Sequence, residues 1–111
     1  MFEYAATLIS IVDGDTLKLE VDLGFHVRVR EVFRLARLNC PELLTLEGMK
    51  ARLFVAGVLS KATALRVTTR RAEKYGRWLA ELDYQTKETG AQWHNLNSLL
   101  LSSGHAKPFK P

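Results

Sequence analysis

The chain has 111 residues and a mass of 12.6 kDa, which is the size of one ordinary domain and leaves little room for two. Hydrophobic residues make up 47% of it and charged residues 25%, so its composition is that of a folded globular domain and excludes extensive disorder. Sixteen Lys and Arg against twelve Asp and Glu give a net charge of +4, which permits a polyanionic partner such as nucleic acid without requiring one.

The first predicted elements are three β-strands. Residues 4–12 are rich in β-branched and aromatic side chains and end at residues 13–15, a turn-forming DGD sequence. Residues 16–23 alternate strictly between polar and apolar side chains, which is typical of a half-buried strand. Gly24 offers a turn, and the alternation that resumes at Phe25 predicts a return strand.

The return strand is irregular at two places. Glu31 interrupts its alternation, and the apolar parity shifts between Leu35 and Leu38. A β-bulge near Ala36 would explain that shift. The strand ends at residues 39–41 (NCP), because proline cannot continue a hydrogen-bonded ladder.

A helix is predicted next, because Thr45 is a suitable N-cap for a segment that runs to about Ala62. Helical spacing predicts one apolar face, with Val55 and Leu59 at its edge. The residues assigned to that face are Leu46, Met49, Leu53 and Ala56. The residues expected to face solvent are Lys50, Arg52 and Lys61.

Two strands and a short helix complete the chain. Residues 63–71 and 78–84 alternate as strands, and either Asn95 or Asn97 could cap a helix through Ser103. We therefore expect a single domain over the whole chain, mainly β with helices (α+β). Its predicted form is a five-stranded OB-type barrel with one helix between the third and fourth strands and a short C-terminal helix. An open α+β sandwich is the alternative that periodicity leaves open.

Other features limit the location and the chemistry of the protein. The single cysteine, Cys40, excludes an internal disulfide, and the three scattered histidines exclude a zinc site built from Cys and His. No apolar run approaches the roughly 20 residues of a membrane span, and residues 1–4 lack the basic start of a signal peptide. We expect a cytoplasmic protein without a membrane anchor, or a secreted one if a leader has been removed.

Three segments carry residues suited to chemistry on phosphates. Residues 13–15 place two carboxylates around a glycine in a tight turn, which offers oxygen ligands of the kind that Ca²⁺ prefers, although the same composition is common in polar β-turns. Arg34 could hold a phosphate and Glu42 could act as a general base, although the two could equally form a surface ion pair. Residues 74–77 (KYGR) combine charge with an aromatic ring, as in phosphate contact with base stacking or in an ordinary basic loop. We expect Trp78 to pack in the core or at its rim.

Taken in order, four motifs resemble the staphylococcal-nuclease (thermonuclease) family from about Ala6 to Ala106. They are DGDT, FRL followed by a PE dipeptide, KYGR-x-LA, and an N-L-N…GHA tail. The resemblance implies the same five-stranded OB-type barrel. It also implies a hydrolase, a Ca²⁺-dependent nuclease that cleaves phosphodiester bonds of DNA or RNA, and we expect it to be a monomer.

The same resemblance implies a set of metal ligands. Asp15 matches a metal-binding carboxylate. Asp13 matches a nearby residue that supports this ligand without binding the metal itself. Asn39 stands where the family has a second aspartate ligand. Cys40 occupies a position that supplies a backbone carbonyl, so its side chain is free to differ.

The resemblance also implies the residues that would act on the substrate. Arg34 and Arg77 match two phosphate-binding arginines, whose guanidinium groups would stabilise charge on the phosphate in the transition state. Glu42 matches a general base or water-orienting residue. Lys74 and Tyr75 match residues that contact the phosphate end of the substrate.

Three departures from the family pattern are expected to weaken activity. Asn39 carries no charge, the stretch between Glu42 and the helix is short, and the chain ends at Pro111 where family members continue into a further helix. The alternative function is a noncatalytic OB-type module that binds nucleic acid or a protein partner. The joint presence of Glu42 with Arg34 and Arg77 favours the enzyme.

Overall fold

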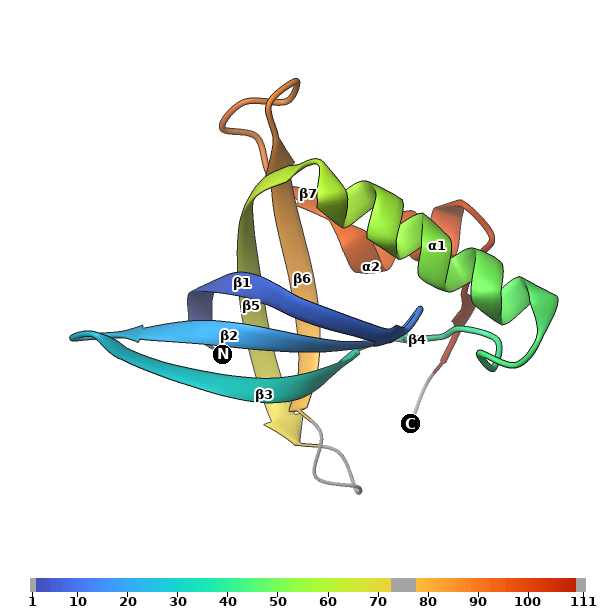
Figure 1. Ribbon diagram of the computed structural model, residues 1–111, viewed down its shortest axis with the longest axis horizontal. Coiled ribbons are helices and arrows are strands. Elements are labelled where there is room, and N and C mark those ends of the chain that lie inside the picture. The colour runs from blue at the N-terminus through green and yellow to red at the C-terminus, as the bar shows by residue number, and fades with distance from the viewer. Residues whose placement is uncertain (1, 73–77, 110–111) are drawn as a thin grey trace.

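Strands come first and last along the chain, and one long helix separates them. A computed structural model describes residues 2–72 and 78–109 (Figure 1). The elements are β1 (Phe2–Asp13), β2 (Thr16–Gly24), β3 (Val27–Leu35), β4 (Leu38–Asn39), α1 (Leu46–Ser60), β5 (Ala62–Ala72), β6 (Trp78–Thr86), β7 (His94–Asn95), α2 (Leu96–Ser102) and β8 (Lys107–Pro108).

The five long strands form a closed barrel. They are hydrogen-bonded in the order β3-β2-β1-β5-β6, and β3 then pairs with β6 in parallel, with Phe33 opposite Trp78 and Leu35 opposite Ala80. This closed five-stranded barrel with two helices confirms the predicted OB-type α+β fold. Antiparallel pairing joins the other long strands, so the parallel β3–β6 pair is the seam of the barrel.

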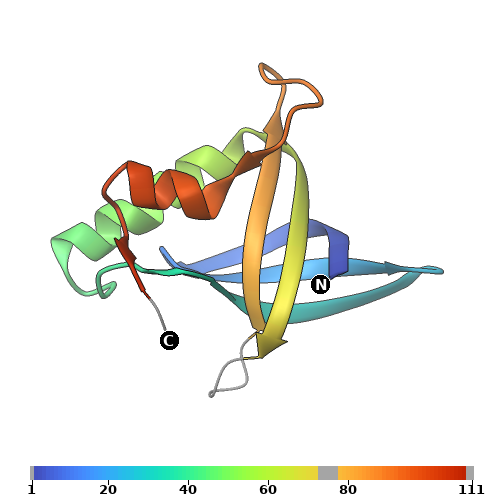
Figure 2. The ribbon, with the colours of Figure 1, turned by 180° about the vertical axis from the view of Figure 1, so that it is seen from behind.

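The core fills the barrel and continues beneath the helices. Every second residue of the strands faces inward, as the alternation in β2 predicts. Both helices lie on the same side of the barrel, away from the β2–β3 turn (Figures 1 and 2), and Val55 of α1 and Leu100 of α2 are fully buried in the core. Within the described residues, neither helix combines the length and the apolarity needed to cross a membrane.

Asn97 holds the seam of the barrel together from α2. Its side chain is fully buried, and its amide oxygen accepts a hydrogen bond from the backbone N–H of Leu82 at 3.0 Å. Its Nδ2 donates to the carbonyl groups of Ala36 and Ala80, each at 3.0 Å. The helix is capped by Asn95, whose side chain accepts from the N–H of Ser98. Asn95 is therefore the cap, and Asn97 has a different role.

Two details predicted for the return strand are wrong. The strand begins at Val27 because Phe25 and His26 form the turn, with φ angles of 54° and 61°, and the Phe25 side chain is 99% exposed. The parity shift near Ala36 is a turn between β3 and β4 rather than a β-bulge, and Arg37 adopts a φ of 73° there. At Phe25 and His26 the left-handed conformation reverses the chain between β2 and β3 within two residues.

Helix α1 is capped at Thr45 as predicted, and its side chain accepts from the N–H of Gly48 at 3.0 Å. The apolar face predicted for this helix is wrong, because Leu46, Met49 and Leu53 are 61%, 52% and 65% exposed. The residues that α1 buries are Gly48, Ala51, Val55 and Leu59. A Cβ atom on Gly48 would lie 1.8 Å from the carbonyl oxygen of Glu42, so this glycine must face the preceding loop and fixes the rotation of the helix.

Candidate functional site

The candidate site lies where the β1–β2 turn meets the end of β3. In the barrel register Thr16 pairs with Arg34, which makes Asp15 and Arg34 neighbours although they are far apart in the sequence. The backbone N–H of Leu35 donates to the carbonyl of Asp15 at 2.8 Å and fixes the turn against β3. The chain leaves β4 at Asn39, beside the same turn.

Asp15 is the centre of the site and only 8% of it is exposed. Its Oδ2 accepts a hydrogen bond from the backbone N–H of Cys40 at 3.0 Å and lies 3.9 Å from the Arg34 guanidinium. Its Oδ1 accepts from the hydroxyl of Thr16 at 3.3 Å. Asp13 supports the turn, because its Oδ1 accepts from the N–H of Asp15 at 3.1 Å. The structure therefore brings Asp13, Asp15, Arg34 and Cys40 together.

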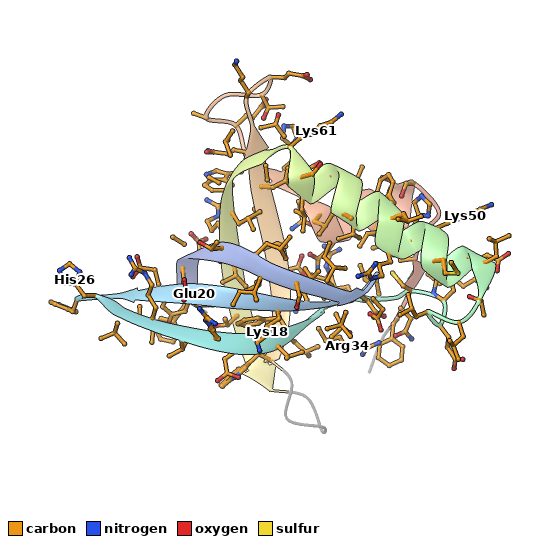
Figure 3. All side chains as sticks on the ribbon, viewed as in Figure 1. Lys18, Glu20, His26, Arg34, Lys50 and Lys61 are labelled. Atoms are coloured by element: carbon orange, nitrogen blue, oxygen red, sulfur yellow. The ribbon has the colours of Figure 1, made fainter. Side chains whose placement is uncertain are left out.

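Arg34 lies at the end of β3, near the C-terminal segment (Figure 3). Besides its ion pair with Asp15, it donates a hydrogen bond to the side-chain oxygen of Asn39. Its guanidinium lies 5.2 Å from the centre of the Phe109 ring, in a cation–π contact. These contacts hold the side chain at the site, with both predicted metal-ligand side chains, Asp15 and Asn39, beside it.

Burial changes the acid–base properties of the site. Burial, together with the hydrogen bond and the negative charge of Asp13, raises the pKa of Asp15 to about 6, although the Cys40 N–H and Arg34 act in the opposite direction. The positive charge of Arg34 therefore compensates the buried carboxylate only in part. Burial, together with the charges of Asp15 and Asp13, raises the pKa of the Cys40 thiol to about 12, which keeps it a neutral thiol.

Gly14 is required by the packing of this turn. A Cβ atom at this position would lie 2.8 Å from the Cys40 sulfur and 3.0 Å from the Ala51 methyl group of α1. The backbone of the turn therefore lies directly against Cys40 and the helix. This close approach sets the position of the two carboxylates that flank the glycine.

The oxygen atoms at the site have the chemistry that Ca²⁺ prefers. Asp13 and Asp15 offer carboxylates, Asn39 offers an amide oxygen and Cys40 a backbone carbonyl. Within the described residues no group of three or more His, Cys, Asp or Glu side chains is placed to hold a metal. Oxygen atoms of Asp15 and Asn39 lie beside the Arg34 guanidinium, so a cation would compete with that group for them. These oxygen atoms therefore suit a weakly held Ca²⁺. Because Arg34 compensates the negative charge of Asp15 only in part, a further positive charge beside Asp15 would be favourable.

The remaining predicted residues are less well defined by the structure. The carbonyl of Glu42 accepts hydrogen bonds from the N–H and the hydroxyl of Thr45 at 3.0 and 2.6 Å, which anchors its backbone at the start of α1. Its side chain is exposed and makes no hydrogen bond or ion pair with another described residue. Lys74, Tyr75 and Arg77 lie outside the described residues.

Phe109 is a site residue that sequence reasoning missed. Strand β8 pairs with β4, with Lys107 opposite Asn39, and the N–H of Phe109 donates to the carbonyl of Arg37 at 2.9 Å. This pairing carries the Phe109 ring to Arg34. The only signal in the sequence is an aromatic residue shortly after the GHA tail, and no periodicity links that residue to β3.

No family model matches the chain, and a search of curated proteins finds no similar sequence. The closed barrel establishes the fold class by itself. Membership of the staphylococcal-nuclease family remains a prediction from the four motifs, and so does the activity that this family implies.

Proposed function

We propose that the chain is a Ca²⁺-dependent nuclease that hydrolyses phosphodiester bonds of DNA or RNA. The observation that supports this proposal best is the pairing of a buried carboxylate with an arginine, since Asp15 and Arg34 lie 3.9 Å apart with Asn39 and Cys40 beside them. An arginine next to a set of oxygen ligands is suited to a phosphate that binds together with a cation.

Arg34 would bind the phosphate through its guanidinium. Its planar fork can donate two hydrogen bonds to non-bridging oxygens and remains charged at any physiological pH. Negative charge that grows on those oxygens in the transition state would be stabilised by this group more strongly than the ground state. Arg77, identified from the sequence, would supply a second guanidinium.

Asp15, Asn39 and the carbonyl of Cys40 would hold the metal ion, and Asp13 would support Asp15 without contacting the metal. A bound Ca²⁺ supplies positive charge that stabilises a phosphate as it gains negative charge. Asp15 would remain ionised in its presence, because a neighbouring positive charge favours the carboxylate over the acid. Asn39 would contribute an oxygen ligand without a charge.

Glu42 would orient and deprotonate the attacking water. Its backbone is anchored to Thr45, and its exposed side chain is accessible to solvent at the start of α1. A carboxylate in contact with water can accept a proton while the water attacks phosphorus.

A noncatalytic module that binds nucleic acid or a protein partner is the second candidate. The observation that favours it is that the site residues already bind one another: Arg34 forms an ion pair with Asp15 and donates a hydrogen bond to Asn39. A neutral asparagine at position 39 also lowers the charge available to a metal. A binding module would need neither Glu42 nor a bound ion.

A cleavage assay on single-stranded DNA and RNA, with Ca²⁺ and with a chelator, distinguishes the two functions. We expect cleavage that requires Ca²⁺ and that falls at least 100-fold in Arg34→Ala, since phosphate stabilisation by a positioned cation has an effect of this order. Arg30→Ala is the matched control, because Arg30 lies on the same strand, is exposed and pairs with Glu20 at 3.3 Å. Binding without cleavage in Ca²⁺, Mg²⁺ and Mn²⁺ would support the noncatalytic module instead.

A further inference from the structure

The end of the barrel away from the two helices contains a cavity of about 230 Å³ that the proposed nuclease function does not use. All five long strands contribute to its wall. The residues that line it are Tyr4, Val21, Leu23, Val29, Glu31, Phe33, Thr69 and Trp78. Three of them are aromatic, and Trp78 remains 40% exposed at the opening.

Glu31 is the one charged residue among the described residues that line the cavity. Its partner across the sheet is the buried Leu19, so Glu31 lies on the inward face of β3, although the residue itself is exposed. Its neighbours on the same face of β3 are Val29 and Phe33, so a carboxylate interrupts an apolar row. This is the residue at which the alternation of the sequence fails. Within the described part of the chain the Glu31 carboxylate makes no hydrogen bond and no ion pair.

The cavity has the electrostatic character of a cation site. The faces of aromatic rings carry negative potential, and the residues that line the cavity include Tyr4, Phe33 and Trp78 together with one carboxylate, Glu31. Among the described residues that line the cavity none carries a positive charge, although the chain as a whole has a net charge of +4. A phosphate or a carboxylate ligand would be repelled by the negative charge of Glu31, whereas a positively charged ligand would be attracted by it.

From this arrangement we propose that the barrel cavity binds an organic cation of the alkylated ammonium class. The alkyl groups would pack against Trp78 and Tyr4, and the positive charge would lie beside Glu31. Aromatic rings attract such cations in proteins, and the attraction is larger when the cation is shielded from water. The proposal is independent of the nuclease function, because the cavity shares no lining residue with the Asp15–Arg34 site.

Choline and its neutral isostere 3,3-dimethylbutan-1-ol provide a direct test, because the two molecules have nearly the same shape and differ in charge. Each molecule would be titrated into a solution of the full chain, and its binding would be followed through the amide chemical shifts of the protein in NMR spectra. We expect saturable shifts around Glu31, Phe33 and Trp78 with choline, and at least tenfold weaker binding of the alcohol. A wall that is merely apolar would bind the two molecules equally, and that result would overturn the proposal.

Two variants separate the contributions of charge and rings. Glu31→Gln keeps the shape of the side chain and should weaken choline binding about tenfold without changing binding of the alcohol, whereas Trp78→Leu should weaken both. Glu20→Gln is the matched control, because Glu20 lies on neighbouring β2 and pairs with Arg30 outside the cavity. If Trp78→Leu does not fold, Glu31→Gln alone decides. The absence of saturable shifts with choline, or tighter binding of the neutral nucleoside guanosine, would overturn the proposal.

Discussion

Asn39 is the residue on which metal binding by this site depends most directly. Its side chain carries no charge, and the side-chain oxygen accepts a hydrogen bond from Arg34. In the proposed site the formal negative charge comes from Asp13 and Asp15 alone. Since calcium affinity depends on the number of charged ligands, position 39 is where one substitution should have the largest effect.

We predict that Asn39→Asp raises calcium affinity by one or two factors of ten, at about 1.4 kcal/mol each. The added carboxylate would lie next to Asp15 and attract the cation. Calorimetric titration of both proteins measures the change, and the Ca²⁺ concentration for half-maximal cleavage should fall in parallel. Gln92→Glu adds the same charge in the loop between β6 and β7 and should leave affinity unchanged. Equal affinities of Asn39→Asp and the parent chain would remove Asn39 from the metal site.

Asp15 should lower the stability of the folded protein at neutral pH in the absence of metal. Its pKa in the folded chain is about 6, against an ordinary value of 3.8. As pH rises from about 4 to about 6, the unfolded chain loses this proton before the folded chain does, so folding stability falls across that window. Above about pH 6 both states are ionised, and the full cost of the buried charge is present.

Asp15→Asn should therefore stabilise the metal-free protein at pH 7.5 by roughly 1–3 kcal/mol while abolishing cleavage. The gain should shrink toward pH 4, where the aspartate is neutral in the folded state. Urea unfolding at both pH values measures it. A variant that is no more stable than the parent chain at pH 7.5 would contradict the raised pKa of Asp15.

At the scale of elements, the short helix α2 contributes more to the barrel than its length suggests. It carries Asn97, whose side chain bonds to strand β6 of the seam and to the turn directly after β3. Each of these backbone groups is buried, and a buried polar group that loses its partner costs about 1–3 kcal/mol. The Asn97 amide therefore reinforces the seam in addition to the backbone pairing of β3 with β6.

We expect Asn97→Ala to lower the free energy of unfolding by about 2 kcal/mol or more, because the N–H of Leu82 and the carbonyl of Ala36 lose the hydrogen bonds that Asn97 gives them, whereas the carbonyl of Ala80 keeps the N–H of Ala36. Urea unfolding followed by circular dichroism measures the loss. Ser102→Ala on the same helix is the control, since Ser102 is exposed and its hydroxyl donates only to Leu99. Similar stability of both variants would mean that the seam does not need the Asn97 side chain.

Helix α1 illustrates why periodicity identified an element but not its buried face. The apolar spacing of Leu46, Met49 and Leu53 predicts burial, yet the backbone of Glu42 approaches so closely that only Gly48 can face it. This contact depends on the path of the loop before the helix. A hydrophobic pattern along the helix contains no information about that path, so the predicted face is rotated from the real one.

At the scale of the molecule, the sequence pattern was sufficient to predict the barrel, but it was not sufficient to predict the contacts that complete the site. Alternation in residues 16–23 predicts a strand with one buried side, and five such strands are enough to predict a closed sheet. The arrangement of Asp15 with Arg34 follows from strand register, which local pattern does not give; the four motifs suggested both residues. Phe109 reaches Arg34 through the β4–β8 pair, and no local pattern signals so distant a pairing.

The parallel seam also sets the order in which the molecule can be completed during synthesis. Asn97 bonds to Ala36 across 61 residues of sequence, so this contact beside the seam cannot form until α2 has been made. Contacts between such distant segments form late and slowly, whereas the hairpin of β2 and β3 can form as soon as it leaves the ribosome. Asp15 and Arg34 can therefore meet early, but the wall formed by β6 and the Phe109 ring joins them only at the end. The Asp15–Arg34 site is therefore complete only after Phe109 has been synthesised and β8 has paired with β4.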